Sequence, residues 1–151
     1  MNEQWLLPGE ATVAVASDHA ALEMRVAIAE HLRGRGYDVR DLGTGTIASV
    51  DYPDYGNAIA AAVTDGRAVA GVALCGSGIG ISIAINRHAG ARGALCHDDT
   101  TARLSRQHND ANILVLGARI VGLAVALSAV DTFIKTEFEG GRHARRVAKL
   151  S

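Results

Sequence analysis

The stretch from Val72 to Asn86 constrains the fold more than any other part of the sequence. An apolar run ends at Cys75, three glycines follow at alternate positions, and an Ile- and Ala-rich segment then continues at helical length. This pattern predicts a buried strand, a tight turn and a helix. Glycines let backbone N–H groups converge, so the turn is expected to bind an anion beside the Cys75 thiol. The three glycines are Gly76, Gly78 and Gly80.

Two features of this stretch have alternative interpretations. Cysteine is among the most buried residue types, so Cys75 can simply end the strand as a small hydrophobic residue, or it can serve as a base or nucleophile beside the turn. The glycine pattern is one residue short of the GxGxxG dinucleotide fingerprint, whose third glycine falls on Ile81. Asp98 lies near the right distance downstream, so a nucleotide-binding module without catalysis is the alternative to an enzyme.

Strands and helices alternate along the rest of the chain as well. Strands are expected at 12–16, 37–42, 69–74, 92–96 and 112–116, and further helices at 20–35, 51–63, 99–108 and 120–138. The first of these helices is expected to bury Leu22, Val26, Ala29 and Leu32. Each strand-to-helix crossover requires the next strand to be parallel. We therefore expect a single doubly wound, Rossmann-like α/β domain, a five-stranded parallel sheet with helices on both faces. The domain is expected at 12–151, after an N-terminal extension at 1–11 and with a basic C-terminal tail at 139–151.

Composition excludes several classes of protein. Fifteen basic and 16 acidic residues give a net charge of −1, which argues against a nucleic acid partner. Two cysteines make no disulfide framework, and the first residues lack the basic region of a signal peptide, so we expect a cytoplasmic protein. The longest apolar run, 120–130, is shorter than the ~18 residues of a membrane span and indicates a buried helix.

Polar residues in five separated segments are expected along one edge of the sheet, where open α/β sheets bind ligands. Asp18 can alternatively be a helix cap and His19 a solvated residue of the first turn. The segments are Asp18-His19, Tyr52, Cys75 to Gly80, His108-Asn109 and Arg119.

The basic C-terminal tail places Arg142 and Arg146 on the same face if it is helical. Such a pair matches the oxygens of a phosphate monoester, whereas the alternatives are a solvated tail and a weak nucleic acid arm. The six histidines show no clustered spacing of the kind that zinc sites use, so no metal is expected.

These motifs resemble the type B ribose-5-phosphate isomerases, a family that includes galactose-6-phosphate isomerase subunits. The resemblance extends from about Thr12 to the end, and the motifs in this order are far more specific than the glycine turn alone. The resemblance implies an aldose-ketose isomerase that uses no metal or cofactor. It also implies a homodimer or tetramer in which each active site takes residues from two subunits. The matching stretches are Ser17 to His19, Asp51 to Pro53, Cys75 to Ala84, Leu104 to Asp110, Gly117 to Arg119 and Glu139 to His143.

The resemblance also implies a role for each site residue. Cys75 is expected to move the proton between C2 and C1, because the glutamate that some relatives use instead is replaced here by Ile81. Ser77, which replaces a threonine of many relatives, and the N–H groups of Gly76, Gly78, Ile79 and Gly80 would stabilise the enediolate. His108 with Asp18 would open the sugar ring, the side chain of Tyr52 would form one wall of the site, and Asn109 would bind a hydroxyl of the sugar. The phosphate would be held by His19, Arg119, Arg142 and Arg146, the last two from the partner subunit.

The expected reaction is the interconversion of ribose 5-phosphate and ribulose 5-phosphate, a step of the pentose phosphate pathway. Nothing in the sequence determines the length of the sugar. The same chemistry on a tetrulose 4-phosphate, or on allose or galactose 6-phosphate, is therefore the alternative within the enzyme class.

Overall fold

The computed structural model describes residues 4–150, which form a five-stranded parallel sheet with strand order β2-β1-β3-β5-β4. The strands are β1 (Thr12–Ser17), β2 (Asp38–Asp41), β3 (Ala70–Cys75), β4 (Gly93–Leu95) and β5 (Ile113–Gly117). A short 3-10 helix, η1 (His19–Ala21), precedes α1 (Leu22–Gly34), and the other helices are α2 (Tyr52–Thr64), α3 (Ile79–Ile85), α4 (Asp99–Asn109), α5 (Leu123–Lys135) and α6 (Arg142–Ala148). The expected doubly wound fold is confirmed.

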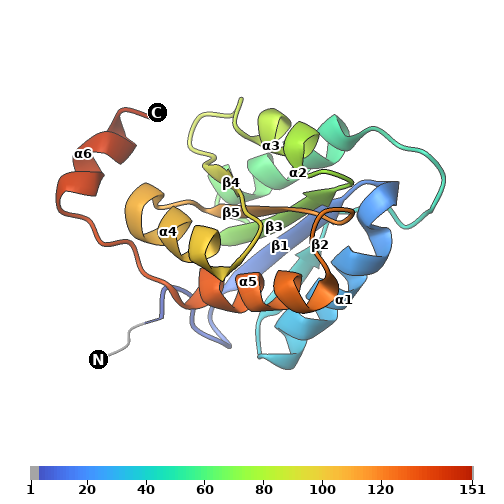
Figure 1. The fold of residues 1–151 in the computed structure, drawn as a ribbon, viewed down its shortest axis with the longest axis horizontal. Coiled ribbons are helices and arrows are strands. Elements are labelled where there is room, and N and C mark those ends of the chain that lie inside the picture. The colour runs from blue at the N-terminus through green and yellow to red at the C-terminus, as the bar shows by residue number, and fades with distance from the viewer. Residues whose placement is uncertain (1–3, 151) are drawn as a thin grey trace.

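Helices cover both faces of the sheet (Figure 1). α2 and α3 pack together on one face, whereas α1, α4 and α5 pack on the other. Each face has its own apolar core: Phe133 and Leu114 belong to the larger one, and Ile59 and Ile113 belong to the smaller. The central strands β3 and β5 are buried along their whole length, as expected of parallel strands covered on both faces.

The buried face of α1 differs from the expected one. Ala29 and Leu32 are buried as expected, but Val26 is 41% exposed and Leu22 is only partly buried. Ile28 and Arg25 take their place in the interior. The apolar pattern was misleading because Arg25 is a buried arginine whose charged end binds polar groups of the neighbouring loop.

The N-terminal segment packs against the larger core. Leu6 is 1% exposed, and Trp5 lies edge-on to Phe133 and directly beneath the guanidinium of Arg106, whose carbon is 3.3 Å from the ring centroid. Burying the tryptophan and the guanidinium together removes apolar area from water and adds a cation–π contact. The domain boundary at residue 12 stays a prediction, but residues 5 and 6 contribute to the core of the domain. Among residues 4–150, no helix is both long and apolar enough to cross a membrane.

Candidate active site

The candidate site begins where β1 and β3 end side by side. The helix after β1 covers one face of the sheet and the helix after β3 covers the other, so the two connections separate at this edge. Such a topological switch point is where doubly wound sheets bind ligands. Ser17 is the last residue of β1, and the next strand ends in Cys75, so Asp18, His19 and the glycine turn all lie here.

The glycine turn places polar groups around the Cys75 thiol. Cys75 is 4% exposed, and its sulfur lies 3.2 Å from the backbone N–H of Gly78, which donates to it. An N–H donor interacts more strongly with a thiolate than with a neutral thiol. The Ser77 hydroxyl accepts from the N–H of Ile79 at 3.1 Å and keeps its own proton for a ligand oxygen. Gly78 has a φ of 78°, a left-handed conformation that favours glycine.

Close packing fixes the turn against its neighbours. A Cβ on Gly117, the last residue of β5, would lie 2.4 Å from the Ser77 carbonyl oxygen, so only glycine allows the turn to approach so closely. Similarly, a Cβ on Gly80 would lie 2.6 Å from Cζ of Tyr52. The Tyr52 ring therefore packs directly against the turn, and its role as one wall of the site stays a prediction.

Arg119 lies on the other side of the turn. Its backbone N–H donates to the Gly76 carbonyl at 2.9 Å. Its side chain packs beside Gly76, because a Cβ added to that glycine would lie 3.5 Å from Cδ and Nη1 of Arg119. A guanidinium beside converging N–H groups is suited to an anionic ligand.

Asp18 and His19 have defined hydrogen bonds. Asp18 is a helix cap, as its alternative interpretation predicted, because its carboxylate accepts from the N–H of Ala20 at 3.1 Å. The N–H of Val50 donates to Nδ1 of His19, also at 3.1 Å. Since Nδ1 accepts this bond, the neutral ring carries its proton on Nε2 and can donate it to a ligand.

Arg25 holds the loop that contains Val50 against the end of β1. Its guanidinium donates to Ser17 Oγ at 2.8 Å and to the Thr44 carbonyl at 2.6 Å, and its Nε lies 3.1 Å from Asp41. We call the group formed by Asp18, His19, Tyr52, Cys75 to Gly80 and Arg119 the thiol site.

His108 and Asn109 do not join the thiol site of their own chain. They end α4, which leads into β5, so they lie at the amino end of that strand whereas Cys75 pairs with Gly117 at its carboxyl end. Asn109 shares a pocket with Gly93, the first residue of β4. Figure 1 shows this end of α4 beside α6, away from the carboxyl ends of the strands. The expectation that all five segments share one edge is therefore wrong.

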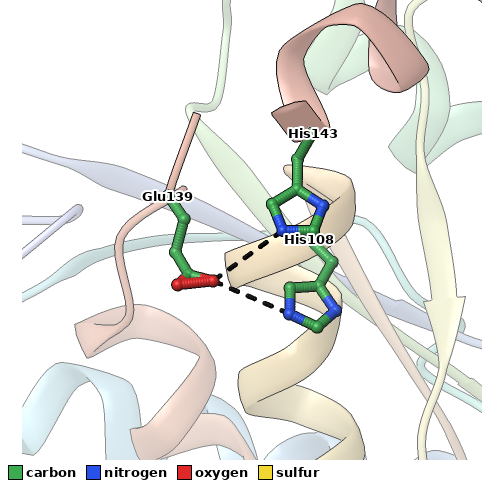
Figure 2. A group of neighbouring side chains, drawn as sticks. All are labelled: His108, Glu139 and His143. Carbon is green, nitrogen blue, oxygen red and sulfur yellow. Dashed lines mark ion pairs between the residues drawn. The ribbon is translucent and has the colours of Figure 1, made fainter. Parts of the chain in front are cut away.

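A second polar group forms around His108 instead. A pocket between α4 and α6, which we call the histidine pocket, is lined by His108, Asn109, His143 and Arg146, among others. The rings of His108 and His143 are stacked, with centroids 4.4 Å apart (Figure 2). Burial lowers the pKa of His143, and the charges of His108 and Arg142 act in the same direction.

The sequence analysis gave Glu139 and His143 no role in a site, although both belong to one of its matching stretches. Their spacing of four residues was visible, but His108 lies far from both in the sequence, and only the docking of α6 on α4 brings the three together. The absence of clustered histidine spacing was therefore no guide to clustering in space.

Asp98 has a structural role. It is the N-cap of α4, and its carboxylate accepts from the Thr101 N–H at 2.7 Å and from the Thr101 hydroxyl at 2.9 Å. The backbone hydrogen bond from Thr101 also lowers the pKa of Asp98. Helix capping therefore accounts for the aspartate that the dinucleotide fingerprint would otherwise explain.

Comparisons with known proteins identify the relatives of this chain. The sequence model of the Ribose/Galactose Isomerase family matches residues 13–150. Ribose-5-phosphate isomerase B of Escherichia coli is 42% identical over 139 residues, covering 92% of this chain and 93% of the relative. The solved structure of Clostridium thermocellum ribose-5-phosphate isomerase B is similar with a TM-score of 0.91 and 51% identity, covering 92% of this chain and 94% of that one. The type B ribose 5-phosphate isomerase of Trypanosoma brucei has a TM-score of 0.90 at 40% identity, covering 93% and 96%.

Proposed function

The chain belongs to the ribose/galactose isomerase family, and from this membership we propose that it interconverts ribose 5-phosphate and ribulose 5-phosphate. The observation that carries the proposal is the thiol site. A thiol, a hydroxyl and a turn of backbone N–H groups lie between a histidine and an arginine at the switch point of the sheet. These are the groups that a proton transfer next to a carbonyl requires.

Cys75 is the base of this mechanism. As thiolate it removes the proton from C2 of the open-chain aldose, which gives an enediolate, and the resulting thiol returns a proton to C1 to give the ketose. The negative charge that develops on O1 and O2 is stabilised by the Ser77 hydroxyl, which the N–H of Ile79 orients, and by the N–H groups of Gly76 and Gly80. These donors belong to one rigid turn, so they need little reorganisation during the reaction.

The complete site requires a second copy of the chain. His108, Asn109, Arg142 and Arg146 are assigned to the same reaction, but they lie at the opposite edge of the sheet from Cys75. The five residues of β5 alone span about 13 Å between the two edges. The sheet itself lies between them, so one bound pentose phosphate cannot contact both groups of residues in the same chain. We infer a homodimer, or a tetramer built from such dimers, in which the histidine pocket of one copy faces the thiol site of the other.

Exposed apolar side chains beside the thiol site support this arrangement. Ile79 and Ile83 lie one turn apart on α3 and are 55% and 57% exposed, and Tyr52 next to them is 42% exposed. Large apolar groups clustered around a polar site indicate a surface that a partner covers. A second copy that brings its own histidine pocket would cover them and exclude water from the enediolate.

His108 of the second copy would open the sugar ring together with Asp18. A pentose phosphate spends most of its time as a closed ring, so an acid and a base must act on the ring oxygen and the anomeric hydroxyl first. Arg142 and Arg146 of the same copy would join His19 and Arg119 around the phosphate, whose charge a cluster of guanidinium groups compensates.

A panel of sugar phosphates tests the proposed function. We expect kcat/KM to be highest for ribose 5-phosphate among ribose 5-phosphate, a tetrose 4-phosphate, allose 6-phosphate and galactose 6-phosphate. A preference for a different sugar would change the substrate but keep the chemistry. No turnover of any of them, together with a rise in melting temperature on adding NAD, would instead favour the nucleotide-binding alternative.

A further inference from the structure

Two histidines and a glutamate meet between α4 and α6 (Figure 2). His108 comes from the end of α4, Glu139 from the loop before α6, and His143 from the first turn of α6. Oε1 of the glutamate lies 3.6 Å from Nε2 of His108 and 3.9 Å from Nε2 of His143. One ligand atom from each of the three residues lies within 4.8 Å of the others.

This set of groups matches the ligands of a transition metal ion. Two imidazoles and one carboxylate form a known zinc-binding set that leaves one coordination position open. Bond lengths of ~2.0–2.1 Å in a tetrahedral site place ligand atoms about 3.3 Å apart. The two distances to the glutamate therefore need to shorten by about 0.3 and 0.6 Å, and the separation of the two histidine nitrogens, which is at most 4.8 Å, by up to about 1.5 Å. We propose that His108, Glu139 and His143 bind a divalent transition metal ion, with Zn²⁺ as the best probe, and that this ion inhibits the isomerase.

The stacked rings must adjust when the ion binds. Their planes are only 14° apart, and the lone pair of an imidazole nitrogen lies in the plane of its ring, so two parallel rings cannot both point at one ion. His143 is packed in the interior, whereas the side chains of His108 and Glu139 are 40% and 50% exposed. Rotation of the His108 ring therefore forms the site, and His143 serves as its fixed ligand.

The surrounding charges select which ions bind. Arg142 and Arg146 are near enough for their charges to act on His143, and the carboxylate of Glu139 opposes them. Mg²⁺ and Ca²⁺ are held by several oxygen ligands and by charge, so this site excludes them. Zn²⁺, Ni²⁺ and Cu²⁺ form strong bonds to imidazole and can still bind.

Inhibition follows from the assignment of His108 to ring opening, and this part rests on the proposed function. A metal ion bound to the imidazole occupies a lone pair of the ring, so His108 can no longer take up and release a proton during ring opening. Activity itself does not need the ion, so treatment with a chelator leaves the activity unchanged or raises it.

The binding experiment uses a chain that lacks thiols, Cys75→Ala with Cys96→Ala, because cysteines also bind zinc. Calorimetric titration with ZnSO4 should show one ion per chain, and Glu139→Gln or His143→Gln in the same background should weaken binding at least tenfold. The matched control is His88→Gln, whose imidazole bonds Asn57 elsewhere on the surface and whose loss should change nothing. Equal affinity in the Glu139→Gln and parent chains would overturn the site. If His143→Gln fails to fold, two results still test the site. One is the zinc affinity of Glu139→Gln, and the other is the absorption spectrum of Co²⁺ bound to the parent chain, which reports nitrogen and oxygen ligands.

The activity experiment separates the site from the proposed function. With intact cysteines, micromolar Zn²⁺ should inhibit turnover reversibly, and Glu139→Gln should resist this inhibition when its turnover with zinc is compared with its own turnover without zinc. Inhibition that persists unchanged in this variant would place the ion elsewhere and overturn the proposal. Binding at the three residues without any inhibition would retain the metal site but remove His108 from the reaction.

Discussion

Gly117→Ala should damage both stability and catalysis, although no reacting atom is changed. The added Cβ would lie 2.4 Å from the carbonyl oxygen of Ser77 and 2.6 Å from its carbonyl carbon. Because both are backbone atoms, the contact can only reach 3.0 Å if the glycine turn moves by at least 0.6 Å. Overpacking of this kind costs about 1–3 kcal/mol. At about 2 kcal/mol, a chain of this size should lose about 4–8 °C in Tm.

The same displacement moves the Ser77 hydroxyl and the N–H donors relative to Cys75. A misplacement of about 1 Å can cost a hundredfold in rate, so we expect kcat to fall roughly tenfold to a hundredfold. The control is Gly34→Ala, because nothing lies within 4 Å of that added Cβ at the end of α1, and alanine there should be neutral or add about 0.5 kcal/mol. Thermal melts and initial rates of the two variants provide the measurement. A Gly117→Ala chain that melts and turns over like its parent would refute the close packing of the turn.

Three further outcomes are expected. Cys75→Ala should abolish isomerisation with a nearly unchanged Tm, whereas Cys96→Ala should stay active; equal behaviour in the rate assay would mean that the base lies elsewhere. Iodoacetamide at neutral pH should spare Cys96 in the folded chain, because burial raises the pKa of this thiol, and mass spectrometry of the labelled peptides would show the opposite if it reacts first. Burial is the largest single influence on Asp131 and opposes its ionisation, but the hydrogen bonds and charges of Arg35 and His31 together outweigh it and lower the pKa of the carboxyl. The stabilisation from this carboxylate is therefore present above about pH 4 and is lost as the pH falls through the folded-state pKa. Urea unfolding of Asp131→Asn should accordingly show a loss of stability at about pH 7 that disappears near pH 2, and an equal loss at both pH values would contradict the ion pair.

The layout of the fold could be predicted from the sequence because the signals are local. Apolar runs mark the strands other than β2, which is the mostly exposed sequence Asp38–Asp41, and the crossover helices leave only a parallel sheet. The buried face of α1 could not be predicted in the same way. Arg25 looks polar in the sequence, and its burial depends on the ends of two strands, Ser17 and Asp41, and on Thr44 of the following loop, which only the fold brings to it.

Candidate site residues could be proposed from the sequence, but their arrangement in space could not. The turn after Cys75 shows its chemistry in a short stretch, so the thiol site could be recognised locally. The position of His108 depends on the direction of α4, which carries its end to the amino edge of the sheet. The contact of His108 with Glu139 and His143 depends on where α6 packs against α4, and no spacing in the sequence indicates that position.

The central claim is that two chains together form each site, with Cys75 from one and Arg146 from the other. The most direct test mixes Cys75→Ala and Arg146→Ala chains, each inactive alone, by unfolding them together in equal amounts and letting them refold. About half of the dimers then contain one chain of each kind. In these, one of the two sites has both residues intact, so roughly a quarter of all sites should be active.

The matched control pairs Cys75→Ala with Arg119→Ala, since both residues belong to the thiol site of one chain. In every mixed dimer of this pair each site keeps one lesion, so no activity should return. With mixed dimers verified by mass, recovery near a quarter for the first pair and none for the second is the predicted result. No recovery for the first pair, or equal recovery for both, would contradict the shared site.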